Sequence, residues 1–116
     1  MGTYVRYLRP DVKIIGVEAE GAASMTRAVA AKRRVRLPLD TLDLFADGTA
    51  VRQVGKESFR LARRCIDEMV TVNVDEICAA VKDVFDDTRV LAEPSGALAA
   101  VSYTHLRAHE TGRNLV

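Results

Sequence analysis

The stretch Val90-Leu-Ala-Glu-Pro-Ser-Gly-Ala-Leu-Ala-Ala100 decides the fold that we expect. It predicts a short apolar strand that runs directly into a helix. Pro94 suits the first turn of a helix, because its φ angle is helical and its missing N–H would have no partner there. Glu93 would then lie at the carboxyl end of the strand and at the positive end of the helix. Open α/β sheets bind their ligands at that edge, so the stretch is typical of a binding site.

Length and composition indicate a soluble globular unit. The chain has 116 residues, of which 48% are hydrophobic and 28% are charged, and its net charge is +1. Charges of both signs are interleaved, which does not favour nucleic acid as a partner. No apolar run reaches the ~20 residues of a membrane span, and the amino end lacks the pattern of a signal peptide. We therefore expect a cytoplasmic protein that does not enter a membrane.

Cysteine and histidine usage excludes several kinds of site. The two cysteines, Cys65 and Cys78, are isolated in helical patterns, so neither a disulfide framework nor a cysteine-rich metal site is expected. Both histidines follow residue 101, which excludes histidine-assisted nucleophilic catalysis and histidine metal sites from residues 1–101. No lysine lies in the apolar surroundings that would suit Schiff-base chemistry. The lysines are Lys13, Lys32, Lys56 and Lys82.

Helices and strands alternate along the chain. Apolar runs predict strands at 13–17, 69–72 and 90–92. Helices are expected at 2–8, 22–31 and 55–66, after Asn73 and from Pro94, and the helix after Asn73 begins with a capping box to Glu76. This order predicts an α/β fold with a parallel sheet and covering helices. Because parallel strands need neighbours and three are few, we expect a partial sheet and an incomplete domain.

The apolar periodicity ends at Ser102. Residues 102–116 are polar and patternless, and they resemble the peptides that vector or adaptor sequence encodes when it is fused to a fragment. We therefore expect residues 1–101 to form the domain fragment and residues 102–116 to be a non-native, unstructured tail. The alternative is a frayed natural terminus.

Two acids are placed for chemistry. Glu18 and Glu93 each sit at the carboxyl end of a predicted parallel strand, and those ends lie along one edge of a sheet. The turn through Asp47-Gly48 is expected to reach the same edge. The alternative is that Glu93 only caps its helix and that Glu18 is a solvated loop acid.

Four blocks of the sequence resemble the biosynthetic threonine dehydratases, or threonine ammonia-lyases. They are VKIIGVEAE (12–20), LFADGTAV (44–51), TVNVDEICAA (71–80) and FDDTRVLAEPSGAL (85–98), in the family's order. The resemblance implies a fold-type II pyridoxal-phosphate enzyme, similar in fold to the tryptophan synthase β-subunit. Such an enzyme converts threonine to 2-oxobutanoate and ammonia in isoleucine biosynthesis. Serine racemases and catabolic serine/threonine dehydratases are the enzyme alternatives, and a non-enzymatic α/β interaction module is the other.

The resemblance also assigns roles to residues. Glu93 would face the cofactor ring and orient the bound substrate. The loop that passes the cofactor and substrate would be Ala46, Asp47 and Gly48. A monovalent or divalent cation site of serine racemase relatives matches Glu18, the backbone of Ala22, and Ser24. Ser24 departs from that pattern, because the relatives have an acid at this position.

Other parts of the family's site would lie outside residues 1–101. The lysine that binds the cofactor, an asparagine loop and a glycine-rich phosphate loop would precede Met1. The serine that meets the pyridine nitrogen and the regulatory domain would follow. We therefore expect a fragment of the catalytic domain that is inactive by itself, from a homo-oligomeric enzyme that acts on threonine and serine.

Overall fold

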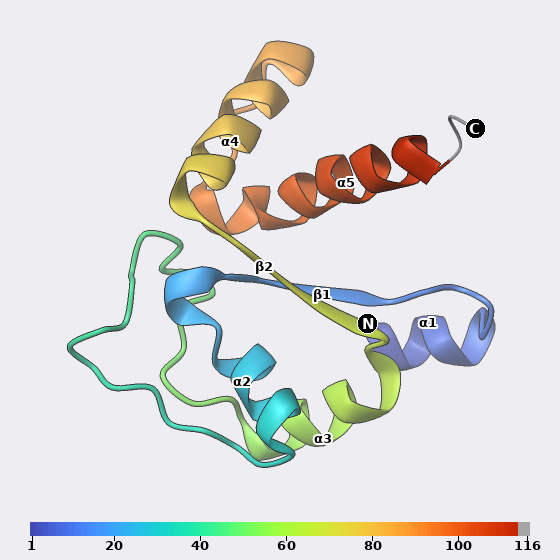
Figure 1. Cartoon of the computed structure of the whole chain (residues 1–116), viewed down its shortest axis with the longest axis vertical. Coiled ribbons are helices and arrows are strands. Elements are labelled where there is room, and N and C mark those ends of the chain that lie inside the picture. Colours follow the sequence, from blue (N-terminus) through green and yellow to red (C-terminus); the bar gives the residue numbers. More distant parts are fainter. Residues whose placement is uncertain (114–116) are drawn as a thin grey trace.

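The protein is described by a computed structural model that covers residues 1–113, with side chains described for residues 1–103. Its two strands, β1 (Ile15–Ala19) and β2 (Glu68–Val72), pair in parallel, with Ile15 opposite Glu68 and Ala19 opposite Val72. The other elements are α1 (Gly2–Leu8), the 3-10 turn η1 (Glu20–Ala22), α2 (Ser24–Ala31), α3 (Lys56–Cys65), α4 (Val74–Thr88) and α5 (Pro94–Arg113). Figure 1 shows α4 and α5 on one side of the sheet and α2 and α3 on the other.

The expected α/β class with a parallel sheet is confirmed, and so are all five predicted helices, with ends that differ by at most two residues where both ends were predicted. The first strand begins two residues later than the apolar run predicts. Glu18 therefore lies within β1 rather than beyond its carboxyl end. None of the helices in the described part of the chain is long and apolar enough to cross a bilayer.

The predicted strand at 90–92 is wrong. These residues join α4 to α5 without strand structure, and the side chains of Val90 and Leu91 are 60% and 77% exposed. An apolar segment becomes a strand only when its backbone groups pair with a neighbouring strand. Among the described residues the sheet contains β1 and β2 alone, and residues 90–92 pair with neither.

The expectation of an unstructured segment from Ser102 is also wrong as far as Arg113, because α5 continues to that residue. Ser102 is buried, and its hydroxyl donates a hydrogen bond to the carbonyl oxygen of Ala99 at 2.9 Å. A serine in a helix can satisfy its hydroxyl in this way without interrupting the helix. Residues 114–116 lie outside the described part, and the foreign origin of residues 102–116 stays a prediction.

The core lies between the sheet and the α4–α5 pair. Side chains alternate along a strand, so Val17, Ala19, Val70 and Val72 all face this pair. At its centre, Val72 is 2% exposed and Ile77 is fully buried. The predicted capping box starts α4, since Asn73 Oδ1 accepts from the Glu76 N–H at 3.0 Å and Glu76 Oε2 accepts from the Asn73 N–H at 2.8 Å.

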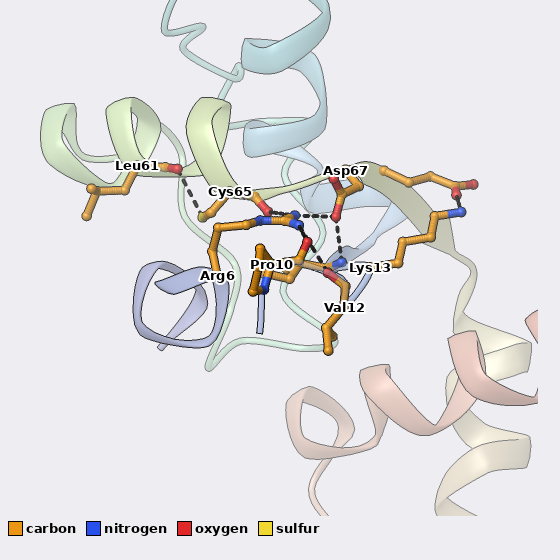
Figure 2. A network of polar contacts seen from close by, with 9 residues as sticks. Arg6, Pro10, Val12, Lys13, Leu61, Cys65 and Asp67 are labelled. Atoms are coloured by element: carbon orange, nitrogen blue, oxygen red, sulfur yellow. Dashed lines mark hydrogen bonds and ion pairs between the residues drawn. The ribbon is translucent and has the colours of Figure 1, made fainter. Parts of the chain in front are cut away.

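A polar network holds α1 to the rest of the molecule (Figure 2). This helix buries no residue of its own. The Arg6 guanidinium instead donates to the carbonyl oxygens of Pro10, Val12 and Cys65 and to the carboxylate of Asp67, at 2.5 to 3.1 Å. Asp67 also accepts from the backbone N–H of Ile14 at 2.7 Å. The network therefore joins α1, the turn before β1, the end of α3 and the start of β2.

Asp67 makes this network sensitive to acid. The Ile14 N–H and the Arg6 guanidinium hold the pKa of Asp67 below its usual value of 3.8. Protonation of Asp67 therefore favours the unfolded chain. The stabilisation that this carboxylate provides is complete above its usual pKa, and it is lost as the pH falls through the lower pKa of the folded chain. We expect Asp67→Asn to lower the urea midpoint at neutral pH, and the difference from the wild-type chain to disappear in strong acid.

The matched control is Asp40→Asn, which changes an exposed acid in the irregular segment. It should leave the midpoint unchanged at every pH. A difference for Asp67→Asn that grew as the pH fell would contradict the role assigned to this carboxylate.

Candidate functional site

The loop through Ala46, Asp47 and Gly48 packs at the carboxyl end of the sheet. Ala46 is 2% exposed and belongs to the same buried cluster as Ala19 and Val72, the last residues of the two strands. Two backbone hydrogen bonds of 3.1 and 3.2 Å, from residues 49 and 50 back to residues 46 and 47, close the turn. Burial of Ala46 thus anchors the loop, while Asp47 and Gly48 stay exposed. The expectation that this turn reaches the carboxyl edge is confirmed.

Gly48 lies directly against the first turn of α5. A Cβ atom added to Gly48 would lie 2.9 Å from Ser95 Oγ and 3.5 Å from Glu93 Oε1. The missing side chain of Gly48 therefore allows this close approach, which places the exposed carboxylate of Glu93 beside exposed backbone. The carbonyl oxygen of Glu93 accepts the first helical hydrogen bond of α5, from Ala97 at 3.1 Å. The structure thus brings together Ala46, Asp47, Gly48 and Glu93, and we call these four with Ser95 the candidate site.

Ser95 is the member of the candidate site that the sequence analysis missed. Its hydroxyl oxygen is buried and has no hydrogen-bond partner among the described residues. Leaving a buried hydroxyl without a partner costs about 1–3 kcal/mol, so native structures rarely keep one without a reason. The signal in the sequence was a single polar residue between Pro94 and Gly96, within a run of otherwise small or apolar side chains.

Glu18 lies one residue before the carboxyl end of β1, but on the opposite face of the sheet from α5. Its side chain alternates with those of Val17 and Ala19 and so faces α2, on the opposite side of the sheet from α5. Its carboxylate accepts hydrogen bonds from the backbone N–H groups of Met25 and Thr26 at 2.9 and 2.7 Å, and from the Thr26 hydroxyl at 2.7 Å. Glu18 therefore caps α2, whose own N-cap residue makes no side-chain bond.

The residues expected to hold a cation, Glu18, Ala22 and Ser24, lie around the start of α2. Both carboxylate oxygens of Glu18 already accept hydrogen bonds from α2. Ser24 is fully buried, its hydroxyl has no hydrogen-bond partner among the described residues, and Ala22 is 3% exposed. The described residues contain no group of three or more His, Cys, Asp or Glu that could bind a metal ion. The cation stays a prediction.

Replacing Glu18 with alanine should weaken α2 and lower the free energy of unfolding by about 1–3 kcal/mol, because three charge-assisted hydrogen bonds are lost. Chemical denaturation gives the free energy, and amide hydrogen exchange shows whether the N-terminal turn of α2 opens. Glu20→Gln, at an exposed position in η1, is the control and should change neither. Unchanged exchange at Met25 and Thr26 would contradict the capping role.

The four lysines occupy other parts of the structure. Lys13 Nζ lies 2.6 Å from Glu68 Oε2, at the amino ends of the strands. Lys82 Nζ lies 2.6 Å from Asp86 Oδ2, on the exposed side of α4. Lys32 directly follows α2, and Lys56 is the first residue of α3. Both helices lie on the other face of the sheet (Figure 1).

Comparison with known proteins gives a consistent result. The sequence profile described as "Pyridoxal-phosphate dependent enzyme" matches residues 1–116. The mitochondrial threonine dehydratase of Saccharomyces cerevisiae is 52% identical over 99 residues, which are 85% of this chain and 17% of that protein. The first curated relatives are all much longer, and the chain spans 17–19% of their length.

Two solved structures have the same fold. The processed form of threonine deaminase isoform 2 from Solanum lycopersicum superposes with a TM-score of 0.82 and 46% sequence identity, over 86% of this chain and 29% of that one. Maize serine racemase superposes with a TM-score of 0.80 and 25% identity, over 86% of this chain and 30% of that one.

Proposed function

Because this chain belongs to the family of pyridoxal-phosphate dependent enzymes, we propose that it forms one wall of the catalytic site of a threonine ammonia-lyase. The enzyme that contains these residues would convert threonine to 2-oxobutanoate and ammonia. The observation that carries the proposal is the contact of the Gly48 loop with Glu93 and Ser95 at the carboxyl end of a parallel sheet. Ligands of open α/β folds bind at that edge.

The candidate site fits one side of a pyridoxal-phosphate pocket. It offers an exposed backbone without a side chain at Gly48, a carboxylate at Glu93, and a buried hydroxyl at Ser95 that has no partner among the described residues. When bound, the cofactor supplies an electron sink for the bond that breaks at the substrate's α-carbon. Glu93 would face the ring and orient the amino acid. Asp47, on the exposed turn, would line the path by which the substrate reaches the cofactor.

Threonine is the substrate that the comparisons favour. Sequence identity is 46% to the tomato threonine deaminase and 25% to the maize serine racemase, at nearly equal TM-scores. We also propose that the whole enzyme accepts serine, forms homo-oligomers and binds a cation. We also propose a cytoplasmic location for this protein, although the yeast relative is named as mitochondrial.

A chimaera tests the proposal. The 99-residue segment of the yeast enzyme is replaced by the matching residues of this chain, and 2-oxobutanoate formation from threonine is measured. We expect turnover, together with the absorbance of bound cofactor. A folded chimaera that binds the cofactor but does not deaminate threonine would contradict the proposal. Conversion of L-serine to D-serine in place of deamination would favour the racemase alternative.

We expect the 116-residue chain by itself to produce no 2-oxobutanoate from threonine and pyridoxal phosphate. The chemistry needs a lysine within reach of the cofactor aldehyde. Two of the four lysines are ion-paired, one at the amino ends of the strands and one on α4, while Lys32 follows α2 and Lys56 begins α3. The yeast enzyme in the same assay is the positive control. The prediction would be overturned if the chain turned over threonine and a Lys→Arg change at one of the four positions abolished this activity.

A further inference from the structure

Residues 37–52 form a closed loop that carries the Gly48 turn of the candidate site. At the base of the loop, the Leu37 N–H donates to the carbonyl oxygen of Arg52 at 2.8 Å, and Arg52 Nε donates to the carbonyl oxygen of Leu37 at 2.8 Å. Leu37 is buried, so the base is fixed to the rest of the molecule. Compact loops whose ends lie close together are frequently functional.

A second contact holds the middle of this loop against η1. The Asp43 N–H donates to the carbonyl oxygen of Gly21 at 3.1 Å, and the Asp43 carboxylate accepts from the Phe45 N–H at 2.8 Å. A Cβ atom added to Gly21 would overlap Asp43 Cβ and would lie 3.2 Å from Asp43 Oδ2. Because Asp43 Cβ is attached directly to the backbone, rotation of the side chain cannot relieve this overlap, and the loop itself would have to move.

The contact with Asp43 is what excludes a side chain at position 21. The φ angle of Gly21 is not positive, so an alanine would suit its backbone. Packing below the loop leaves room for movement, because a cavity of about 150 Å3 lies between the loop and the ends of the strands. The residues that line this cavity include Ala19, Gly21, Asp43, Phe45, Val72 and Ile77. The Gly21–Asp43 contact therefore sets the position of the loop above the strands.

We propose that Gly21 and Asp43 are positioning residues of the candidate site. Their contact holds the turn at Gly48 at the distance from Glu93 at which the carboxylate orients the substrate. Asp43 precedes this turn by a few residues, and the turn is closed by its own hydrogen bonds, so a displacement at Asp43 would carry Gly48 with it. The inference rests on the proposed function, since it concerns the orientation of substrate by Glu93.

The Gly21→Ala variant of the yeast chimaera tests the inference. The loop must move by about 1 Å to admit the added methyl group, and a misplacement of that size can reduce an enzymatic rate by about 10²-fold. We expect kcat for threonine to fall between about 10-fold and 100-fold, with cofactor absorbance kept. Gly55→Ala is the matched control, because the added Cβ atom would lie at an ordinary contact distance of 3.5 Å from Ser58 Oγ. It should leave kcat unchanged.

Two double variants show whether the effect passes through Asp43 and Glu93. Asp43→Gly removes the Cβ atom that the new methyl group would meet, so adding Gly21→Ala to it should change kcat by less than about 2-fold. Glu93→Gln removes the charge that the loop positions, and Gly21→Ala should then lower kcat by less than about 3-fold more. A change that only loosened the fold would lower kcat by the same factor in each background.

The urea midpoint of the 116-residue chain tests the contact without catalysis. Gly21→Ala should lower this midpoint in the wild-type chain and leave it unchanged when Asp43→Gly is present. Asp40→Gly makes the same change at an exposed position of the same loop, and Gly21→Ala should keep its full effect there.

Three outcomes would overturn the inference. They are full activity of the Gly21→Ala chimaera, an equal loss of kcat with and without Asp43→Gly, and an equal loss with and without Glu93→Gln. A parent chimaera that does not deaminate threonine would overturn the proposed function instead. The urea midpoints would then still decide whether Gly21 and Asp43 fix the position of the loop.

Discussion

Replacing Glu93 with glutamine in the yeast chimaera should lower the rate of threonine deamination about 100-fold or more, with the cofactor still bound. Glutamine keeps the size of the side chain and removes its charge. Glu93 lies where its carboxylate faces the exposed backbone of Gly48 at the carboxyl end of the sheet, so its charge should act on bound substrate rather than on the fold. Loss of correct orientation alone can reduce an enzymatic rate by a factor of about 10².

The measurement separates orientation from folding. Cofactor absorbance and the thermal midpoint should match those of the parent chimaera, while kcat falls. Glu20→Gln changes another exposed acid at the same edge of the sheet and should leave kcat unchanged. If Glu93→Gln kept full activity, the role assigned to Glu93 would be wrong. If it lost the cofactor as well, its role would be binding rather than orientation of the substrate.

The largest expected loss of stability follows from Ile77→Ala. Ile77 is fully buried on α4, between the sheet and α5, in the cluster that also contains Val72, Ala46 and Leu98. Truncation removes buried apolar surface and leaves a cavity, which typically costs about 2–5 kcal/mol. Because one sheet of two strands carries this core, a loss of that size is a large part of the total stability. Urea denaturation followed by far-UV circular dichroism measures it.

Two further variants make the result specific. Ile77→Val should cost only about 0.5–1.5 kcal/mol, since it removes one methylene. Cys78→Ala changes the next residue of the same helix, which is exposed, and should have almost no effect. An Ile77→Ala chain as stable as the wild type would mean that α4 does not pack on the sheet as described.

Local features of the fold were predictable from the sequence. The capping box of α4 needs only Asn73 and Glu76, which are three residues apart, so its pattern is visible without any tertiary contact. The two confirmed strands are apolar runs bounded by polar residues. Residues 90–92 have the same pattern and are not a strand, because strand formation depends on a neighbour that the pattern does not specify.

The candidate site was predictable in part. The Asp47-Gly48 turn and Glu93 were identified separately, and the structure joins them through a contact that spans more than forty residues of sequence. Ser95 was missed because its hydroxyl is notable only once it is buried without a partner. The face of the sheet that Glu18 occupies was not predicted, because the strand boundary and the alternation of side chains along β1 decide it.

The sequence by itself determined the class of fold, the order of helices and strands apart from residues 90–92, the family resemblance and the acid at the start of α5. These properties depend on periodicity, capping and motifs, whose partners lie within a few residues. Only the tertiary structure decided that Glu18 caps α2, that Gly48 meets Glu93 and Ser95, and that residues 90–92 stay unpaired. The Glu18 cap depends on which face of β1 the side chain occupies, and the other two depend on groups far apart in the chain. Chain packing alone sets whether such groups come within hydrogen-bonding or van der Waals distance.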